Sequence, residues 1–269
     1  MCFAVIVGLA ACTAKPAKQP VAGRKAAANG AIKFRRIVDY EGWLARDFFE
    51  DREQLALCEA ISSNDLDDIK LLAKSQKLIN SPGKHGFTIL HWAFVNENLV
   101  AFQVLLQAGA DPDLKLTQHI DGKHFAFYKN DSILFSSLRC YRPAYCLAAL
   151  PYSKNPNQLC GEDNLLHTYF LTSVTTNENE LKQFIHQKVD VLKIGSYGYT
   201  PCHWAASKNP KLCIPLIEAG ADPGIRNKKG KDTCDTLRAQ RDLLKNVGQD
   251  VTEYEYALDW INAHKSGQQ

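Results

Sequence analysis

The stretch that decides the fold is HGFTILHWA at residues 85–93, because it recurs as YGYTPCHWA at residues 197–205. Each copy leads into an apolar segment, and each unit closes with AGADP, at residues 108–112 and again at 219–223. Self-similarity of this kind is the sequence signature of a repeat architecture. In such an array each unit buries the apolar face that its neighbour leaves exposed.

Weaker copies of the same unit fill the rest of the chain. NLLH at 164–167 matches the helix start of one further unit, and SILF at 132–135 matches a more degenerate one. Residues 55–80 have the pattern of an opening unit without its hairpin, and residues 230–239 that of a closing unit. The sequence therefore predicts about six units over residues 52–244.

One more helix is expected after the last unit. Residues 251–263 place Tyr254, Leu258 and Ile261 at helical spacing, which is typical of an amphipathic helix. Repeat arrays need terminal units with a polar outer face. We therefore expect this helix to cap the array.

The two complete copies resemble the GxTPLHxA opening and the GAD closing of ankyrin repeats. The resemblance implies an all-α ankyrin-repeat solenoid over residues 39–269, built of helix-turn-helix units with short hairpin loops. It also implies structural roles for the motif. Thr88 and Thr200 stand where a hydroxyl can cap a helix, and His91 and His203 where an imidazole can bond the nearby backbone.

Several residues depart from the repeat pattern. Pro215 falls inside the second helix of the penultimate unit, where a missing backbone donor predicts a kink. Lys188 replaces the terminal glycine of the fourth unit and Glu180 replaces an apolar helix residue. We expect the fourth unit to be the loosest.

The largest departure is an insertion. His91 and its counterpart Phe135 are 44 residues apart, whereas the family repeat has ~33. About eleven extra residues therefore lie within 115–130, and long ordered loops often carry function. Two interpretations stay open: a binding loop, or a long hairpin whose aromatic residues pack locally. As a binding loop, it predicts that truncating Phe127 and Tyr128 together weakens partner binding without lowering the melting temperature. Its candidate binding residues are His119, Lys123, Phe125, Phe127 and Tyr128, with His124 beside them.

The resemblance also implies where a partner would bind. In ankyrin repeats the hairpin tips and first helices line the concave face, so Phe87, Tyr197 and Tyr199 are candidate exposed contacts. Trp92 and Trp204 stand on first helices, where an alternative role is semi-buried packing.

The N-terminal residues predict where in the cell the protein is located. Residues 1–11 are largely apolar and end in LAA before Cys12, which resembles the lipobox of bacterial lipoproteins. That resemblance implies a signal peptide over residues 1–11, a lipid on Cys12, and a flexible basic tether over residues 12–38. Thr13 favours the periplasmic face of the outer membrane. No basic residue precedes the apolar run, so we expect a truncated signal; a buried strand with an incidental cysteine is the alternative.

Charge and cysteine spacing argue against several classes of activity. Seven basic and no acidic residues fall within 13–38, whereas the remainder of the chain is acidic. A nucleic-acid partner would therefore depend on the tether alone, and none is expected. Beyond Cys2 and Cys12 there are seven cysteines, without CxxC or zinc-ligand spacing. They are expected to be small core residues, although an exported protein could form one or two disulfides.

No catalytic residues, metal or cofactor are expected from the sequence. Cys202 and His203 are adjacent, and side chains adjacent on a helix do not face each other. Residues 64–68 (NDLDD) lack the glycine and the distant glutamate of a calcium loop and are better explained as a helix cap.

The combination of an ankyrin array with a lipoprotein address resembles the immunity proteins that some Gram-negative bacteria encode beside phospholipase effectors of type VI secretion. The resemblance implies a non-catalytic protein that binds and occludes an antibacterial lipase. Two other functions remain open. One is a periplasmic scaffold that stabilises a resident enzyme, and the other is a cytosolic ankyrin adaptor.

Overall fold

The computed structural model describes residues 42–173 and 176–266, which belong to one compact unit, Arg36–Gln269. The proposed signal peptide, Cys12 and the basic tether lie outside the described residues. Within the described part, no helix is both long and apolar enough to span a bilayer.

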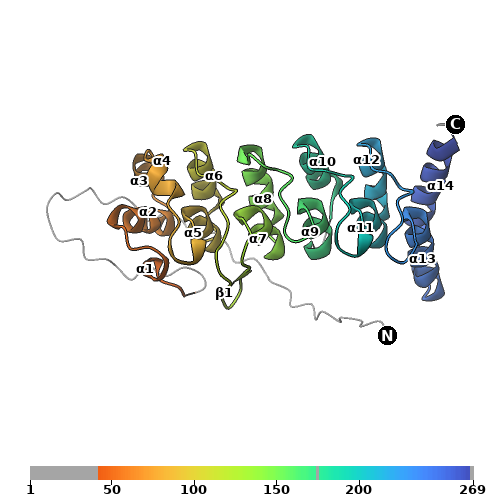
Figure 1. Ribbon diagram of the computed structural model, residues 1–269, viewed down its shortest axis with the longest axis horizontal. Helices are drawn as coiled ribbons and strands as arrows, with labels where there is room; N and C mark the ends of the chain where they lie inside the picture. Colours follow the sequence, from red (N-terminus) through yellow and green to blue (C-terminus); the bar gives the residue numbers. More distant parts are fainter. Residues whose placement is uncertain (1–41, 174–175, 267–269) are drawn as a thin grey trace. The chain divides into compact units, whose positions relative to one another are not determined.

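Six pairs of helices lie side by side in sequence order (Figure 1). The first helices form one row and the second helices another, and each helix contacts the next one in its own row. The first row is α2 (Arg52–Ser63), α5 (Ile89–Val95), α7 (Ile133–Arg139), α9 (Leu165–Thr172), α11 (Pro201–Lys208) and α13 (Thr233–Asn246). The second row is α3 (Leu66–Leu72), α6 (Leu99–Gln107), α8 (Pro143–Ala149), α10 (Glu178–His186), α12 (Cys213–Glu218) and α14 (Thr252–Ser266).

Short elements connect these pairs. Two small helices flank the first pair, 3₁₀ turns precede or extend several others, and one two-stranded hairpin falls between the second and third pairs. These elements are α1 (Ala45–Phe48), α4 (Gln76–Asn80), η1 (Lys84–Gly86), β1 (Ile120–Asp121), β2 (Ala126–Phe127), η2 (Leu150–Tyr152), η3 (Ser196–Gly198) and η4 (Pro210–Leu212).

The helix starts are fixed by the residues that the sequence singles out. At the start of α5, the Thr88 hydroxyl accepts from the backbone N–H of His91 at 3.4 Å, and His91 Nδ1 accepts from the backbone N–H of Thr88 at 3.3 Å. At the start of α11, His203 Nδ1 likewise accepts from the backbone N–H of Thr200 at 3.1 Å, while the His203 N–H donates to the Thr200 carbonyl oxygen at 3.0 Å. Such reciprocal bonds satisfy donors that a helix start otherwise leaves free. The expected histidine bonds to the nearby backbone are confirmed in both units, and the expected hydroxyl cap is confirmed for Thr88.

Histidine side chains also join consecutive units. The Nε2 atom of His167 lies 3.0 Å from the Tyr199 carbonyl oxygen, and that of His203 lies 3.0 Å from the Lys231 carbonyl oxygen. In both cases the acceptor is the residue just before the N-cap of the following first helix. We call this series of bonds the histidine ladder.

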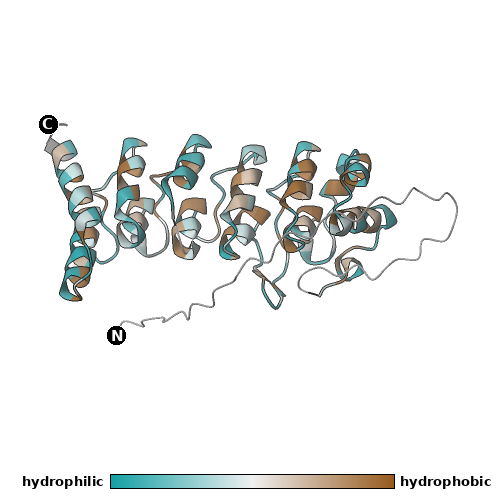
Figure 2. Cartoon of the chain, turned by 180° about the vertical axis from the view of Figure 1, so that it is seen from behind, coloured by the Kyte–Doolittle hydropathy of each residue, from teal (hydrophilic) through white to brown (hydrophobic). Residues whose placement is uncertain are grey.

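The apolar core runs between the two rows of helices. α6 is strongly apolar, whereas the closing helix α13 is more hydrophilic (Figure 2). Trp92 is fully buried, and its indole N–H donates to the Cys58 carbonyl oxygen at 3.1 Å, which links the first two units. At the far end Leu258 and Ile261 of α14 are buried. This confirms the expected capping helix, which is the second helix of the sixth pair.

Two local expectations have different outcomes. The Asp65 carboxylate accepts from the backbone N–H of Asp68 at 3.1 Å, so residues 64–68 cap α3 as predicted. Pro215, in contrast, does not kink a longer helix. The chain first forms the 3₁₀ turn η4, and Pro215 becomes the third residue of α12, where a missing backbone donor leaves no intrahelical bond unmade.

Candidate protein-binding surface

The insertion forms an antiparallel hairpin in which Ile120 pairs with Phe127 and Asp121 with Ala126. Its base is closed by backbone bonds from Leu116 N–H to the Asp131 carbonyl at 2.9 Å and from Asn130 N–H to the Leu116 carbonyl at 2.8 Å. This geometry matches the local-hairpin interpretation of the insertion.

The hairpin buries two of its candidate binding residues. Phe125, just before β2, is 4% exposed and Phe127 is 0% exposed, with their ring centroids 6.2 Å apart. The Phe127 ring lies 5.9 Å from Phe87, 6.0 Å from Phe94 and 6.1 Å from Trp43. The expected exposure of Phe125 and Phe127 is therefore wrong: both belong to the core.

The hairpin also interrupts the histidine ladder. Asp131 occupies the position before an N-cap, but its carbonyl accepts from Leu116 of the hairpin instead of a histidine. His91 Nε2 has no hydrogen-bond partner in the described part of the chain, and the Phe127 ring stands beside the imidazole. Burial lowers the pKa of His91 to about 3, so this imidazole is neutral.

The outer side of the hairpin is polar and exposed. Tyr128 is 46% exposed, and its ring centroid lies 4.8 Å from that of His119. The Arg139 guanidinium lies 5.3 Å from the same ring, within cation–π range. His119 in turn bonds Asp121 at 2.8 Å, and Lys123 is exposed at the tip. The structure therefore brings His119 and Tyr128 together as a positioned pair.

A buried cluster of Asp131, Arg139 and Cys160 supports the side of the hairpin that carries Tyr128. The Asp131 carboxylate is fully buried; it accepts from Arg139 Nε at 2.8 Å and from the Cys160 thiol at 3.0 Å. Burial raises the pKa of Asp131, while Arg139 and Cys160 oppose that rise. This cluster has no signature in the sequence, since its members are spread over three segments.

The other candidate binding residues, on hairpins and first helices, also divide into buried and exposed ones. Phe87 and Trp92 are both 0% exposed; the expected exposure of Phe87 is wrong, since it packs on Phe48, and Trp92 has the packing role that was the alternative to a binding one. Tyr197 is 71% exposed at its hairpin tip. Tyr199 and Trp204 are half-buried, with ring centroids 4.9 Å apart.

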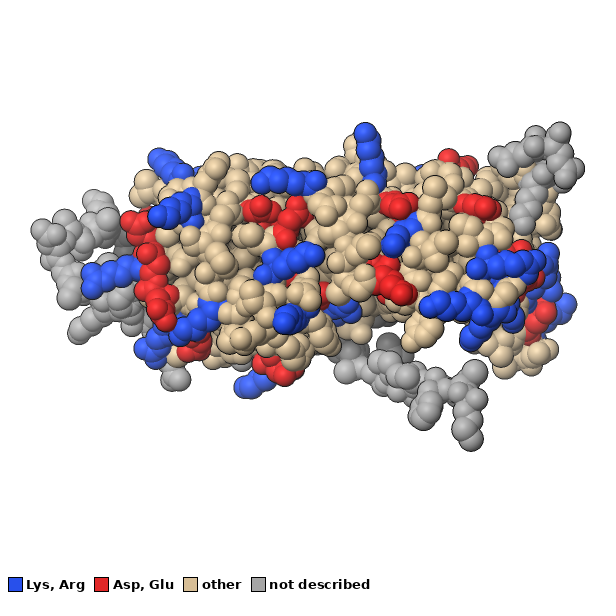
Figure 3. All heavy atoms as spheres, viewed as in Figure 1, with Lys and Arg blue, Asp and Glu red and all other residues tan. Residues whose placement is uncertain are grey.

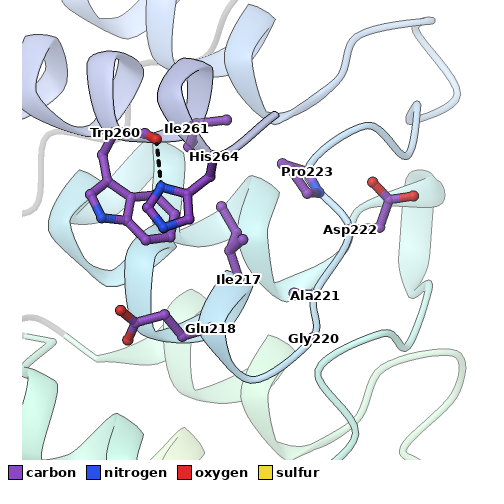
Figure 4. Close-up of a pocket in the computed structure, with 9 residues that line it drawn as sticks. All are labelled: Ile217, Glu218, Gly220, Ala221, Asp222, Pro223, Trp260, Ile261 and His264. Atoms are coloured by element: carbon purple, nitrogen blue, oxygen red, sulfur yellow. Dashed lines mark hydrogen bonds between the residues drawn. The ribbon is translucent and has the colours of Figure 1, made fainter. Parts of the chain in front are cut away.

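A cavity of about 430 Å³ lies between α12, the following loop and α14 (Figure 4). Trp260 and His264 are one turn apart on α14, and their rings stack at 3.5 Å. Glu218 contributes a carboxylate to the opposite wall (Figure 4). The signal for this cavity in the sequence is the Trp260–His264 spacing of four on an amphipathic helix.

The cysteines lie almost entirely in the core. All seven in the described ranges are free thiols, and all but Cys160 are buried. Burial raises the pKa of Cys202 to about 12, which keeps its thiol protonated. Among the residues that the structure covers, no three His, Cys, Asp or Glu side chains are placed to hold a metal ion.

The architecture is that of a helical repeat protein whose stacked units present hairpins along one edge. The ankyrin repeat model matches residues 85–115 and 197–228. The chain thus contains ankyrin repeats, and its fold is an ankyrin-repeat solenoid, as predicted.

Solved structures agree on the fold. An ankyrin repeat domain from Acinetobacter baumannii superposes with a TM-score of 0.57 at 19% identity, covering 75% of this chain and 95% of that one. A chain from the complex of a predatory endopeptidase of Bdellovibrio bacteriovorus with immunity protein Bd3460 superposes with a TM-score of 0.52 at 20% identity, covering 76% and 96%.

Two curated proteins are similar to about three quarters of this chain. Mouse palmitoyltransferase ZDHHC13 is 30% identical over 201 residues, and the bovine mitochondrial disaggregase is 25% identical over 201 residues. These alignments cover 73% and 74% of this chain but only 30% and 23% of those proteins. The chain therefore spans less than a third of the length of either relative.

Proposed function

We propose that this chain is a non-catalytic, lipid-anchored immunity protein that binds an antibacterial lipase or phospholipase effector and occludes its active site. The observation that carries the proposal is a rigid ankyrin array that positions exposed tyrosines at its hairpins. A similar fold occurs in the complex of an endopeptidase with immunity protein Bd3460.

The exposed surface is suited to gripping a protein. Tyr128 and Tyr197 present aromatic area from hairpins whose backbones are hydrogen-bonded to neighbouring units. Tyrosine contributes strongly to protein interfaces because its large ring has few rotatable bonds. A preformed surface of this kind loses little conformational entropy on binding.

Occlusion needs no chemistry from the array itself. Burial lowers the pKa of His91, His167 and His203, and their Nδ1 atoms take part in helix caps. These histidines are therefore committed to structure. The inhibitor would act by covering the lipase's active site or its membrane contact.

The proposed location follows from the N-terminal resemblance to a lipoprotein. A lipid on Cys12 would hold the inhibitor at the periplasmic face of the outer membrane, where an incoming effector acts. Labelling with palmitate tests this, with Cys12→Ala as the control. Equal labelling of the two chains would contradict lipidation at this residue.

The experiment that tests the immunity role uses the gene product encoded next to this chain. That protein is directed to the periplasm with and without the full chain, and cell survival is measured. We expect toxicity that the chain relieves, and a one-to-one complex of the two proteins. A harmless neighbour that nevertheless binds the chain would instead indicate the periplasmic scaffold.

The affinity of variants for the same partner protein locates the binding surface. Tyr128→Ala combined with Tyr197→Ala is expected to weaken the complex by more than ~2 kcal/mol. Tyr256→Ala is the matched control, because Tyr256 is 56% exposed on α14, away from the hairpins. Equal affinity of the two variants would exclude the hairpin tyrosines from the interface.

A further inference from the structure

The last two hairpins form a continuous surface of mixed character. The backbone N–H of Lys228 donates to the Tyr197 carbonyl at 3.1 Å, so the two hairpins are joined directly. The first hairpin exposes apolar side chains: Leu192 is 51%, Ile194 50% and Tyr197 71% exposed. The second exposes lysines. We call the set of Leu192, Ile194, Tyr197, Lys228, Lys229 and Lys231 the basic–apolar surface.

The basic half of this surface carries lysines that form no ion pair among the described residues. Residues 226–231 hold four basic side chains and no acidic one. None of the ion pairs in the described ranges includes Lys228, Lys229 or Lys231; Arg226, in contrast, approaches Asp235 at 3.6 Å. Lys and Arg side chains gather around this end of the array (Figure 3). The lysines are thus available to an external carboxylate.

Nearby carboxylates are engaged in the turns themselves. Asp190 accepts from Leu192 N–H at 2.8 Å, and Asp222 accepts from Gly224 N–H at 2.7 Å. Asp232 caps α13 by accepting from Asp235 N–H at 2.8 Å. These hydrogen bonds hold the carboxylates in their turns, where none of them forms an ion pair with Lys228, Lys229 or Lys231.

The lysine hairpin is also preorganised. Asn227 is 6% exposed, and its side-chain oxygen accepts from the backbone N–H groups of Lys229 at 2.9 Å and Lys231 at 3.2 Å. A buried clamp of this kind fixes the turn before any partner arrives. Binding then has a smaller entropic cost.

Tyr197 adopts a left-handed backbone conformation, yet its side chain is not packed in the core. Its φ is 60°, in the left-handed region that glycine and asparagine tolerate best, and its side chain is the most exposed large apolar one in the described part of the chain. Residues that occupy unfavourable backbone regions concentrate at functional sites. His85 has φ 64° at the same step of the earlier hairpin, so the left-handed turn belongs to the repeat, and it is the exposure of the Tyr197 ring that suits it to an external contact.

We propose that the basic–apolar surface binds an acidic protein segment in which carboxylates alternate with apolar side chains. Carboxylates would pair with Lys228, Lys229 and Lys231, while apolar side chains would cover Leu192, Ile194 and Tyr197. The proposal rests on the proposed protein-binding function and assigns the chemistry of the partner. An anionic membrane is the competing occupant, and the test below distinguishes it.

Peptide selection on the immobilised full chain tests the chemistry. Random peptides of about twelve residues are selected and measured by fluorescence anisotropy against the chain and its variants. We expect enrichment of peptides rich in Asp and Glu, with affinity that falls steeply as salt is raised. Enrichment of neutral or basic peptides would overturn the proposal. So would capture of phosphatidylglycerol vesicles by a chain that enriches no acidic peptide.

Matched variants test the place. The triple variant Lys228→Ser, Lys229→Ser and Lys231→Ser is expected to lose at least about tenfold in affinity for the selected peptides. The control Lys70→Ser, Lys74→Ser and Lys77→Ser removes the same charge from exposed residues of the first unit. Tyr197→Asn suits the left-handed backbone and so keeps the fold, yet it should also weaken binding. Equal losses in the two triple variants would overturn the proposal.

The two proposals fail in different ways. If the lipase complex forms and the lysine triple variant binds it as tightly as the original chain, the basic–apolar surface is excluded while the immunity function stands. If acidic peptides bind at this surface but the neighbouring gene product is harmless, the surface stands and the immunity function does not.

Discussion

The Phe127 ring stands edge-on to the His91 imidazole, with ring centroids 5.7 Å apart and an interplanar angle of 88°. This contact takes the position that a carbonyl oxygen occupies beside His167 and His203. The insertion therefore replaces one polar step of the histidine ladder with an aromatic contact. Phe127 is therefore a structural residue at the junction between the second and third units.

Phe127→Ala is expected to lower the free energy of unfolding by ~3–5 kcal/mol, the usual cost of truncating a buried phenylalanine. Tyr128→Ala, one residue away and 46% exposed, should cost no more than ~1 kcal/mol. Urea denaturation followed by circular dichroism measures both. Equal costs would contradict the burial of Phe127.

Acid is expected to destabilise the fold through His91. Its pKa is about 3 in the folded protein against 6.5 for an unperturbed histidine, so the unfolded chain binds more protons between these values. The free energy of unfolding therefore falls as the pH drops below about 6.5, by ~1.4 kcal/mol per pH unit from this residue. The lowered pKa values of His167 and His203 act in the same direction.

His91→Phe isolates that contribution, since Phe135 occupies the same step of the next unit. Unfolding is measured at about pH 7.5 and about pH 5, and the variant should show a smaller loss between the two conditions. His186→Gln, at an exposed residue of α10, is the control. An unchanged pH dependence in His91→Phe would remove this residue as its source.

Lys188→Gly is expected to stabilise the fourth unit. Lys188 has φ 59°, a conformation that costs a side-chain-bearing residue roughly 1–2 kcal/mol. Glycine avoids this strain but loses roughly 0.5–1 kcal/mol to backbone entropy, so the net gain is about 0.5–1 kcal/mol. Lys182→Gly, inside α10, should have the opposite sign. A loss of stability in both variants would contradict the left-handed assignment.

Asp113→Ala should release the loop that precedes α9. The Asp113 carboxylate accepts from Ser153 Oγ at 2.6 Å, from Lys154 N–H at 2.7 Å and from Gln158 Nε2 at 2.8 Å. We expect a loss of roughly 2–3 kcal/mol in the free energy of unfolding. Asp121→Ala removes only an exposed contact to His119 and should cost less than ~1 kcal/mol. A similar cost for both would argue against the anchoring role.

The sequence predicts the fold well because the information is local and repeated. The helix caps and turns depend on residues that are close in sequence: Thr88 with His91, Thr200 with His203, and the left-handed Gly109 and Gly220. The expected helices, the caps and the position of the insertion all follow from such short-range patterns.

Burial within the insertion could not be predicted in the same way. An aromatic residue on a long loop has the same sequence signal whether it faces solvent or the core. Phe125 and Phe127 turn inward because the neighbouring units leave an apolar opening beside Phe94, a fact of tertiary packing. The Asp131–Arg139–Cys160 cluster was likewise invisible because its parts converge only after folding.

The hairpin has two regions with different tolerance to replacement. Phe125 and Phe127 plug the core, whereas residues 122–124 form the connecting turn outside it. A foreign peptide grafted into that turn would be displayed on a fixed stem without disturbing the stack. The insertion is thus a natural site for engineering, in which new recognition sequences can be exchanged as long as the two phenylalanines are kept.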